Sequence, residues 1–307
     1  MSYELVIIGG GPAGLSAGIY ASRLGLKTII LEKGVAGGLI SEAPLVENYP
    51  GFPAVNGMKL AEKLREHAIK NVEIAEFEPV RKIERNKDFK VYTDNKCITC
   101  KAVILATGTR KRKLGVPGEK ELKGKGVSYC AVCDGPFFKG CRVAVVGGGN
   151  SAALEALYLA EIGCKVVLIH RRKQLRAEKI LQDRLKEKGV KLLVPAVITE
   201  IIGRNSVEAV KINKLDLNVE EKVDVEAVFI AIGEDPNSEL ASEIGVKTDS
   251  RGYVIVDRTQ RTNIERFYAA GDVTGGFRQV VTACAEGAIA AFSAYEDIKQ
   301  PYWRSTT

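Results

Sequence analysis

The sequence contains no long apolar segment. None of its apolar runs approaches the roughly 20 residues that a helix needs to cross a bilayer. The N-terminus, M-S-Y-E-L-V-I-I-G-G-G, also lacks the basic region and the cleavage site of a signal peptide. We therefore expect a cytoplasmic protein that has no membrane partner.

A framework of structural disulfides is missing as well. The cysteine count is odd, and the seven residues are scattered as Cys97, Cys100, Cys130, Cys133, Cys141, Cys164 and Cys284. In a reducing compartment such thiols supply at most one redox or metal pair. Cys141, Cys164 and Cys284 stand alone in the sequence, and we expect them to be small buried residues.

No nucleic-acid-binding motif accompanies the positive charge. The net charge is +7, and the densest basic run is R-K-R-K at 110–113. Gly and Pro follow this run at once in L-G-V-P-G-E-K, so we interpret it as a solvated connector between domains. We expect no nucleic-acid partner.

One structural unit is present twice, in a chain whose 307 residues favour two domains. The first copy has a strand at Glu4–Ile8, the turn G-G-G-P-A-G, a helix to Leu24 and a strand at Lys27–Leu31. The second has a strand at Arg142–Val146, the turn G-G-G-N-S-A, a helix to Ile162 and a strand at Lys165–Ile169. The segments A-V-I-L-A-T-G at 102–108 and A-V-F-I-A-I-G at 227–233 extend the match.

The glycine turns predict that each copy binds a dinucleotide. The first glycine allows a tight turn, the second lets a pyrophosphate approach the backbone, and the third small residue lets the helix pack on the strand. The helix N-terminus then offers N–H groups and a partial positive charge to the phosphates. These positions are Gly9, Gly11 and Gly14 in the first copy and Gly147, Gly149 and Ala152 in the second.

The residues at the second strand ends indicate which dinucleotide each copy binds. Glu32 ends the first copy, and a carboxylate accepts hydrogen bonds from ribose hydroxyls, as FAD or NAD requires. The matching position is His170, followed by Arg171, Arg172 and Arg176, whose guanidinium groups would hold a 2′-phosphate. We expect FAD in the first copy and NADPH in the second.

A third segment completes the first domain. A strand at Arg266–Ala270 is followed by G-D-V at 271–273 and by a helix through Cys284 to Ala294. Asp272 then bonds the ribityl or phosphate part of the flavin, and the helix points at the pyrophosphate. We predict an α/β fold of two Rossmann-like three-layer ββα dinucleotide-binding domains, the second inserted into the first. FAD is assigned to 1–112 and 243–307, and NADPH to 113–242.

Two C-x-x-C pairs raise the question of zinc. The gap of 29 residues between Cys100 and Cys130 exceeds the 15–20 residues of the usual two-pair zinc site. Cys97 and Cys100 also open a predicted strand, on which residues three apart point to opposite faces. We therefore expect no metal site and treat Cys97 and Cys100 as structural residues.

Cys130 and Cys133 differ because a carboxylate and the NADPH half follow them. Two thiols in C-x-x-C can close a small ring, and a thiolate of low pKa can attack the disulfide of another protein. Asp134 directly behind them can donate or accept a proton. We interpret Tyr129–Gly135 as a two-electron relay.

Together these motifs resemble those of a known family. They are G-G-G-P-A-G, E-N-Y-P-G-F at 47–52, C-A-V-C-D-G, G-G-G-N-S-A, H-R-R with Arg176, A-G-D-V and R-Q-V at 278–280. The chain resembles, essentially end to end, the thioredoxin reductases of the low-molecular-weight bacterial and archaeal type, in class II of the pyridine nucleotide-disulfide oxidoreductases. C-x-x-C-D-G combined with H-R-R is the specific signal, since the first glycine turn alone fits many flavoproteins.

The resemblance implies roles for the relay residues. Cys133 corresponds to the cysteine that faces the flavin, Cys130 to the one that exchanges with thioredoxin, and Asp134 to the acid that protonates the leaving thiolate. Family members are homodimers whose NADPH half swings relative to the FAD half. Glycine-rich connectors near Gly115–Gly126 and Gly233–Pro236 suit such a motion.

The resemblance also extends both nucleotide sites. For FAD it adds Pro12, Ala13, Lys33, Gly37, Gly38, Leu39, Asn48, Ala106, Thr107, Gly108, Gly271, Arg278, Gln279 and Val280. For NADPH it adds Asn150, Ser151, Ile232 and Gly233. Leu39 departs from the Gln that many relatives carry, which leaves one polar flavin contact of the family without its usual side chain.

The function implied is NADPH-dependent reduction of the thioredoxin disulfide. An alternative partner is another disulfide protein, such as a glutaredoxin-like protein or a peroxiredoxin. A second alternative is an electron transferase like ferredoxin–NADP reductase, but such relatives lack C-x-x-C-D-G. A third, from a different class, is a zinc-stabilised binding protein, which would contain no flavin.

Overall fold

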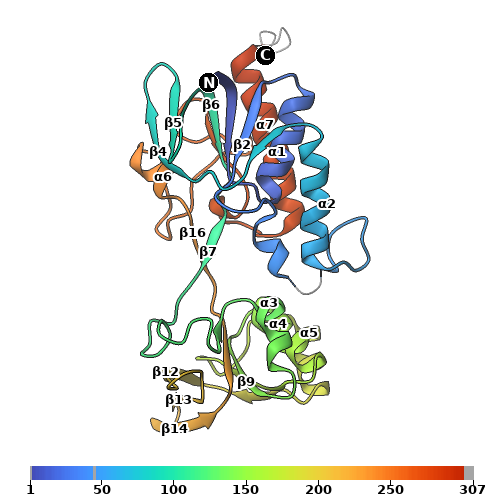
Figure 1. Ribbon diagram of the computed structural model, residues 1–307, viewed down its shortest axis with the longest axis vertical. Coiled ribbons are helices and arrows are strands. Elements are labelled where there is room, and N and C mark those ends of the chain that lie inside the picture. The colour runs from blue at the N-terminus through green and yellow to red at the C-terminus, as the bar shows by residue number, and fades with distance from the viewer. Residues whose placement is uncertain (1, 44–45, 301–307) are drawn as a thin grey trace. The chain divides into compact units, whose positions relative to one another are not determined.

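The computed structural model describes residues 2–43 and 46–300, apart from the side chain of Cys133. The chain divides into two compact units (Figure 1). Unit 1 consists of Met1–Arg110 and Asp235–Thr307, and unit 2 is Lys111–Glu234.

Unit 1 is built on a sheet whose parallel part carries the first glycine turn. Its strands follow the order β3-β2-β1-β6-β5-β4, with β17 also paired to β6. β6 is long enough to serve two neighbours, because its first residues pair with antiparallel β5 and its last with parallel β17. The strands are β1 (Ser2–Ile8), β2 (Thr28–Leu31), β3 (Glu73–Ala75), β4 (Val80–Arg85), β5 (Phe89–Thr93), β6 (Cys97–Leu105) and β17 (Phe267–Ala269).

Three helices cover one face of this sheet (Figure 1). They are α1 (Pro12–Arg23), α2 (Gly57–Ile69) and α7 (Val280–Lys299). Because successive side chains of a strand point to opposite faces, Leu5 and Ile7 pack against these helices, and Val6 and Ile8 pack on the other side. This double burial explains why β1 is an almost continuous apolar run.

Unit 2 repeats the plan. Its parallel sheet has the order β11-β10-β9-β15-β8, and a separate antiparallel sheet has the order β12-β13-β14. Val143 and Val145 pack on the helix side, and Ala144 and Val146 on the other. The parallel strands are β8 (Val127–Ser128), β9 (Arg142–Gly147), β10 (Lys165–Ile169), β11 (Lys191–Leu193) and β15 (Ala227–Ala231).

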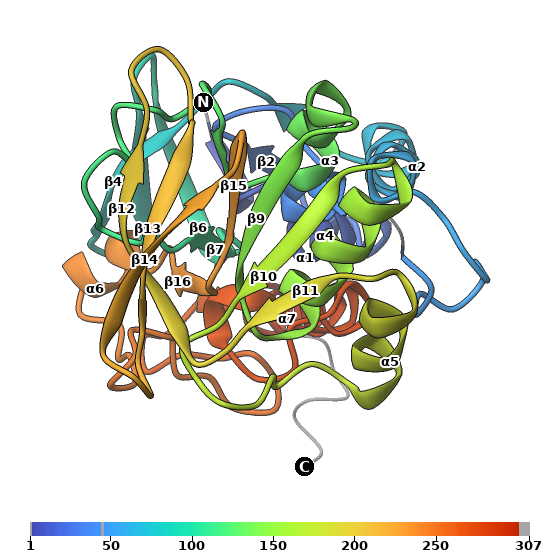
Figure 2. The same ribbon diagram turned by 90° about the horizontal axis from the view of Figure 1, so that it is seen from below.

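Helices and the antiparallel sheet lie on opposite sides of the parallel sheet of unit 2 (Figure 2). The helices are α4 (Asn150–Glu161) and α5 (Lys179–Glu187). The antiparallel strands are β12 (Ala196–Ile202), β13 (Ala209–Lys214) and β14 (Val219–Asp224). A short helix α3 (Ala131–Asp134) and the 3-10 turn η2 (Gly135–Phe138) connect β8 to β9. The three-layer α/β prediction is thus confirmed for both units.

The unit boundaries differ from the predicted ones. The chain leaves unit 1 after Arg110 and returns at Asp235, whereas the sequence suggested 112 and 243. The connecting strands β7 (Thr109–Lys111) and β16 (Glu234–Pro236) pair with each other. The return comes early because helix α6 (Glu239–Glu243) packs within unit 1, where Arg110 forms an ion pair with Glu239.

The glycine-rich stretch Gly115–Gly126, expected as a flexible connector, is fastened into unit 2. The N–H of Ile201 donates to the carbonyl of Pro117 at 2.9 Å. A Cβ at Gly118 would lie 1.9 Å from the carbonyl oxygen of Ile201, so this backbone packs closely against β12. Flexibility of the connection is therefore expected in the segments of β7 and β16 rather than here.

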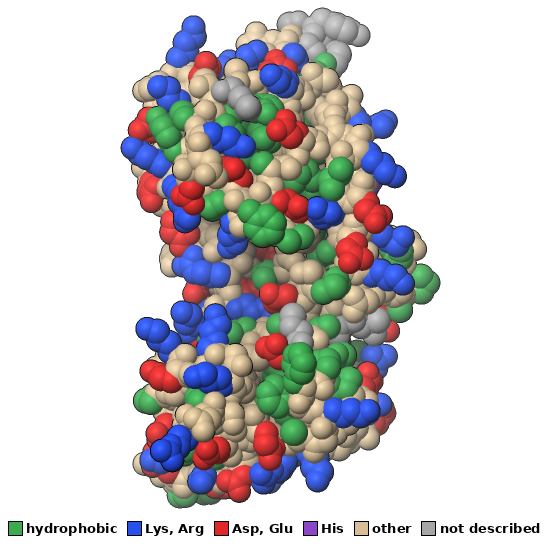
Figure 3. Space-filling model, viewed as in Figure 1, with side chains coloured by type: hydrophobic (Ala, Val, Ile, Leu, Met, Phe, Trp, Pro, Cys, Tyr) green, Lys and Arg blue, Asp and Glu red, His purple; other side chains and the backbone are tan. Residues whose placement is uncertain are grey.

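The surface is mixed in charge. On the face shown in Figure 3, Lys and Arg side chains alternate with Asp and Glu over both units. Within residues 2–43 and 46–300, no helix has the length and apolar character needed to cross a membrane.

Candidate functional site

The first glycine turn has the close packing that a dinucleotide site needs. Gly9 has φ +106°, and a Cβ on it would lie 2.3 Å from the carbonyl oxygen of Ala106. A Cβ on Gly14 would lie 1.8 Å from the carbonyl oxygen of Gly9. Gly11 is different, because the nearest atom to a Cβ on it would be the Cα of Gly38, at 3.8 Å. The turn is therefore closed at its base and open where a pyrophosphate would approach.

Glu32 reaches back to the same turn from the end of β2. Its Oε2 accepts a hydrogen bond from the N–H of Gly10 at 2.6 Å, and its Oε1 accepts one from Gly34 at 3.0 Å. Each carboxylate oxygen has a further lone pair for a ribose hydroxyl. Helix α1 starts at Pro12 without a side-chain cap, so its first N–H groups point at the opening.

The Gly37-Gly38 segment crosses over this turn. The N–H of Gly37 donates to the carbonyl of Gly10 at 2.8 Å, and both glycines have positive φ. The next residue, Leu39, lies half-buried in the 3-10 turn η1 (Gly38–Glu42). Lys33 is exposed beside Glu32. These predicted FAD residues therefore surround the opening of the first turn.

Other predicted FAD residues come together in pairs. The amide of Asn48 donates to Oε1 of Gln279 at 3.0 Å, across a large gap in sequence. Gln279 caps helix α7, whose first residue is Val280. The neighbouring Arg278 instead donates to the hydroxyl of Tyr253 at 3.1 Å, so this side chain is directed to a partner that the sequence did not suggest.

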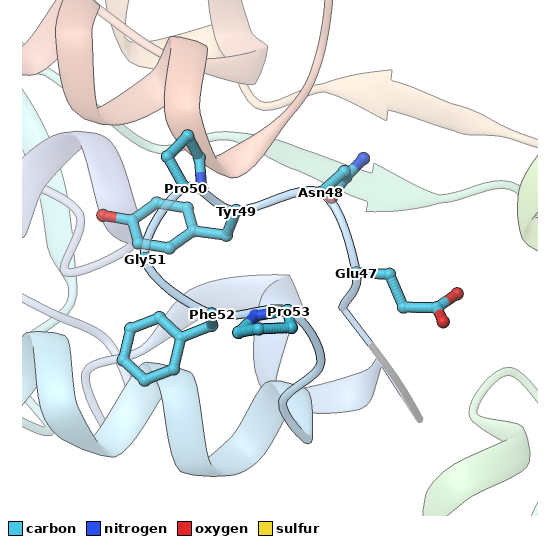
Figure 4. Close-up of a pocket in the computed structure, with 7 residues that line it drawn as sticks. All are labelled: Glu47, Asn48, Tyr49, Pro50, Gly51, Phe52 and Pro53. Atoms are coloured by element: carbon cyan, nitrogen blue, oxygen red, sulfur yellow. The ribbon is translucent and has the colours of Figure 1, made fainter.

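The loop that holds Asn48 encloses a pocket of about 520 Å³, lined by residues 47–53. Figure 4 shows the rings of Tyr49 and Phe52 on the same side of the loop, with Glu47 on the other. The two ring centroids are 6.2 Å apart. Burial and the neighbouring Cys284 thiol raise the pKa of Tyr49. The E-N-Y-P-G-F motif thus forms a compact aromatic loop.

Two further segments close the first site. Thr107 donates from its hydroxyl to the carbonyl of Asn237 at 2.7 Å, and Asn237 N–H donates to the carbonyl of Gly108 at 3.0 Å. Gly271 starts the 3-10 turn η3 (Asp272–Thr274), and its N–H donates to Oε2 of Glu286 at 2.7 Å. Burial raises the pKa of Glu286. Sequence reasoning missed Glu286 because a single carboxylate inside a helix gives no local signal.

The second glycine turn matches the first. Gly147 has φ +155°, and a Cβ on it would lie 2.2 Å from the carbonyl oxygen of Ala231. A Cβ on Gly149 would meet nothing within 4 Å, so the turn is open at the same place. Helix α4 begins without a side-chain cap, at Asn150 and the exposed Ser151. The amide of Asn150 donates to Oε1 of Glu178 at 2.6 Å, and Glu178 is another residue that the sequence did not indicate.

His170 stands where Glu32 stands in unit 1, at the end of the second strand. It is only 7% exposed, and its Nε2 has no hydrogen-bond partner among the described residues. Burial, followed by the positive charges of Arg176, Arg172 and Arg171, lowers the pKa of His170. The three arginines therefore gather around one imidazole, and the N–H of Arg176 bonds the carbonyl of Gly148 at 2.6 Å.

The residues present fit the two implied cofactors. In unit 1 an uncapped helix, an open glycine and a carboxylate meet at one point, as FAD requires. In unit 2 an uncapped helix and an open glycine meet an unpartnered imidazole and three cations, as a 2′-phosphorylated dinucleotide requires. Ile232 and Gly233 follow β15, beside this second turn in the fold.

The redox segment follows β8 in unit 2. Cys130 is disulfide-bonded. The side chain of Cys133, its expected partner, lies outside the described residues. The N–H of Cys130 donates to the hydroxyl of buried Ser128 at 3.0 Å, and the N–H of Asp134 donates to the carbonyl of Cys130 at 3.2 Å. The segment is thus held by local hydrogen bonds on both sides of Cys130.

A buried carboxylate fixes the residue before Cys130. Glu119 accepts hydrogen bonds from the hydroxyl of Tyr129 at 2.5 Å and from the N–H groups of Leu114 and Gly115 at 2.9 and 2.6 Å. Lys111 donates to the carbonyl of Tyr129. No pattern in the sequence connects Glu119 with the redox segment, because the contact depends on the path of the chain before β8.

The other C-x-x-C pair has the geometry expected of a strand. Cys97 is exposed and Cys100 is buried, so the two thiols lie on opposite faces of β6. Within the described part of the chain, no group of three or more His, Cys, Asp and Glu side chains could hold a metal ion.

Comparison with known proteins extends this picture. The family model for pyridine nucleotide-disulphide oxidoreductases matches residues 3–287. A thioredoxin reductase of Listeria innocua is 41% identical over 302 residues, which cover 97% of this chain and 94% of the relative. The structure of T. acidophilum thioredoxin reductase has a TM-score of 0.92 at 41% identity, covering 96% of this chain and 98% of the other. That of Lactococcus lactis thioredoxin reductase has a TM-score of 0.93 at 40% identity, covering 97% and 100%.

Two glycine turns of one design, together with a disulfide-bonded cysteine that precedes the second in the chain, define an oxidoreductase that joins two dinucleotides to a redox disulfide. Proteins of this kind use FAD and NADPH, and these are the cofactors of this chain. The chain belongs to the pyridine nucleotide-disulphide oxidoreductase family and, within it, to the thioredoxin reductases.

Proposed function

We propose that this chain reduces the disulfide of thioredoxin with electrons from NADPH. The observation that supports this most directly is the disulfide-bonded Cys130 in C-A-V-C-D-G, in a chain with two nucleotide turns of opposite ribose chemistry. Held at the glycine turn of unit 1, FAD would supply the hydride acceptor for NADPH and the two-electron donor for the Cys130–Cys133 disulfide.

The nucleotide turns bind and orient the two dinucleotides. Glu32 accepts hydrogen bonds from the ribose hydroxyls of FAD, and the start of α1 donates N–H groups to its pyrophosphate. In unit 2 the start of α4 does the same for NADPH. Arg171, Arg172 and Arg176 hold the 2′-phosphate with charge-assisted bonds, which selects NADPH over NADH.

The reduced cysteine pair transfers its electrons by thiol–disulfide exchange. Cys130 attacks one sulfur of the thioredoxin disulfide as a thiolate, which forms a mixed disulfide and releases the other thioredoxin sulfur as a thiolate. Asp134 supplies the proton to the leaving thiolate. Cys133 then attacks the sulfur of Cys130 and re-forms the internal disulfide. The second thioredoxin sulfur is displaced and takes the proton of the Cys133 thiol, so thioredoxin leaves as a dithiol. The oxidised cysteine pair is thus restored, and two electrons have passed to thioredoxin.

Replacing Cys133 with Ser tests this function. The Cys133→Ser variant should retain rapid bleaching of flavin absorbance by NADPH, because both nucleotide sites are intact. Its thioredoxin-dependent turnover should fall by at least about a thousandfold, because the internal disulfide cannot form. Stopped-flow absorbance and a coupled thioredoxin assay measure the two steps separately. Cys97→Ser is the matched control, since that exposed thiol belongs to no site and its loss should change neither step. Thioredoxin turnover in Cys133→Ser would refute the relay.

We also propose that the chain works as a homodimer in the cytoplasm. Helices α1 and α7 pack together and leave large apolar side chains in solvent, among them Tyr20, Ile289 and Phe292, with exposures of 51%, 40% and 45%. A cluster of this kind on neighbouring helices is typical of a surface that a second copy covers. The free thiols of Cys97, Cys100, Cys141, Cys164 and Cys284 suit a reducing compartment.

A further inference from the structure

Two free cysteines of unit 2 occupy matching positions on neighbouring strands. Cys141 immediately precedes β9 and Cys164 immediately precedes β10, and these strands are parallel and in register. Backbone hydrogen bonds flank the pair. The N–H of Lys165 donates to the carbonyl of Cys141 at 2.8 Å, and the N–H of Gly140 donates to the carbonyl of Gly163 at 3.2 Å. The two cysteines are therefore held side by side.

Their side chains also share one face of the sheet. Cys164 belongs to the apolar core beneath α4, and Cys141 packs against the same core. In-register residues of parallel strands have Cα atoms about 4.8 Å apart, inside the range of about 4.4–6.8 Å found for disulfides. Gly140 and Gly163 precede the two cysteines with φ +84° and +98°, so each cysteine can turn toward the other without straining a preceding side chain.

The two thiols differ in access and in bonding. Cys164 is 7% exposed, and its S–H donates to the carbonyl of Phe138 at 3.1 Å. Burial, and then the nearby Cys141, raise the pKa of Cys164, so at neutral pH it is a thiol. Cys141 is half-buried and is the thiol of the pair that a small solute reaches.

We propose that Cys141 and Cys164 form a second dithiol, distinct from Cys130 and Cys133, which closes to a disulfide when a hydroperoxide reaches Cys141. The sulfur of Cys141 attacks the peroxide oxygen, giving a sulfenic acid and one water from hydrogen peroxide. The sulfur of Cys164 then displaces the hydroxyl, which leaves as a second water with the proton of Cys164. Two thiols lose two electrons, and the peroxide takes both.

Closing this disulfide acts on the redox segment. Phe138 ends η2, the turn that directly follows Asp134. The carbonyl of Phe138 accepts from the S–H of Cys164 at 3.1 Å and from the N–H of Cys141 at 2.9 Å. Closing the disulfide removes the first donor and shifts the residue that supplies the second, which loosens the end of η2 next to the redox segment. The pair lies at the amino ends of β9 and β10, whereas Gly147 and His170 lie at their carboxyl ends. Oxidation therefore slows disulfide exchange and leaves NADPH binding unchanged.

Peptide mapping tests the bond itself and needs no turnover, so its result is independent of the proposed function. The holoenzyme is treated with hydrogen peroxide, alkylated with N-ethylmaleimide and digested with trypsin. Cleavage after Lys139, Arg142 and Lys165 gives peptides 140–142 and 143–165 and separates both from Cys130 and Cys133. We expect these two peptides as one joined species that dithiothreitol splits.

Cys97 and Cys100 provide the internal control, because they lie on opposite faces of β6 and should each take up N-ethylmaleimide after denaturation. Single alkylation of Cys141 and Cys164 after peroxide treatment, or separate oxidation of each, would overturn the proposal.

The Cys141→Ser variant tests the consequence. After peroxide treatment and removal of excess peroxide, wild-type thioredoxin turnover should fall several-fold and return with dithiothreitol. Flavin reduction by NADPH should be unchanged. Cys141→Ser should keep its turnover, and Cys164→Ala should behave in the same way. An equal loss in wild type and variants would assign the damage to other residues and overturn the proposed effect, as would a joined peptide without loss of turnover.

Discussion

Single residues at the second strand ends distinguish the two nucleotide sites. In unit 1 this position is Glu32, whose carboxylate bonds the glycine turn and would repel a 2′-phosphate. In unit 2 it is His170, a buried imidazole among three arginines. The charge at one position of a repeated unit thus sets which dinucleotide is favoured.

Removing one of the arginines should therefore weaken the binding of NADPH and leave the binding of NADH unchanged. Arg171→Ala and Arg176→Ala each delete a charge-assisted contact worth about 1.5–3 kcal/mol, which corresponds to roughly a 10- to 150-fold rise in the KM for NADPH. The KM for NADH should stay constant, because NADH has no 2′-phosphate. Steady-state kinetics with both dinucleotides measure the effect. Lys173→Ala, an exposed cation of the same segment, is the control and should change neither KM. Equal losses for NADPH and NADH would contradict the assignment.

His170 should make the stability of the protein depend on pH. Its pKa is lowered in the folded state, chiefly by burial and then by the three arginines, so the unfolded chain binds its proton first as the pH falls. The free energy of unfolding should decrease as the pH drops through about 6.5, the ordinary pKa of histidine, toward the lower folded-state pKa. Above that range His170 is neutral in both states and does not lower the free energy of unfolding.

The measurement is urea unfolding at about pH 7.5 and about pH 5.5. Wild type should lose more stability between these conditions than His170→Gln, which cannot titrate. His67→Gln removes the other histidine, an exposed residue of α2, and should retain the wild-type difference. The same pH dependence in wild type and His170→Gln would show that other groups cause it.

At the scale of elements, each turn between strand and helix contains some glycines that folding requires and others that cofactor binding requires. Gly9 is required by its close contact with the carbonyl of Ala106, and Gly14 by its close contact with the carbonyl of Gly9. Gly11 and Gly149 have ordinary φ values of −75° and −97° and open surroundings, so alanine fits there without a cofactor. The added methyl would instead occupy the approach of a pyrophosphate.

Replacing Gly11 or Gly149 with alanine should weaken the binding of a different dinucleotide in each case. Gly11→Ala should fold normally but lose affinity for FAD by about tenfold or more, and it should still bind NADP⁺ in a calorimetric titration. Gly149→Ala should keep its FAD and raise the KM for NADPH by a similar factor. Each variant is the control for the other. If both lost the same nucleotide, or if neither lost affinity, the assignment of the two turns would be wrong.

The elements that the sequence predicted share one property, because each has its signal inside a short window. Apolar runs bounded by glycine turns identified β1, β9 and β10, and the last of these has the predicted bounds. The tight turns at Gly9 and Gly147 were predicted in the same way. Helix α7 runs past the predicted Ala294 to Lys299, and Pro301 was the sequence signal for this later end.

Contacts between distant segments gave no such signal. Asn48 meets Gln279 only because of how the strands between them are paired, and Glu119 meets Tyr129 only because of the path of the chain before β8. Cys141 and Cys164 were each predicted as isolated residues, yet the parallel register makes them neighbours. A one-residue slip in that register would separate them, and the sequence alone does not fix it.

At the scale of the whole molecule, repetition of one plan explains why the chain crosses between units twice. Each unit buries both faces of a parallel sheet, with helices on one side and antiparallel strands on the other. Unit 1 needs β17 and α7 from the C-terminal part of the chain to complete its sheet and its helical layer. Unit 2 is therefore an insertion between β7 and β16.

The apolar surface on α1 and α7 leads to the last prediction. Phe292 is 45% exposed, and its ring lies 6.4 Å from that of Tyr295 in the centroid-to-centroid distance. If a second copy covers this surface, Phe292→Glu places an unpaired charge in an apolar contact, which costs several kcal/mol. Light scattering after gel filtration should give the mass of two chains for wild type and of one chain for the variant. Ile180→Glu, at a more exposed apolar site on α5 of unit 2, is the control and should remain dimeric. A wild type with the mass of one chain, or a dimeric Phe292→Glu, would exclude this surface as the dimer interface.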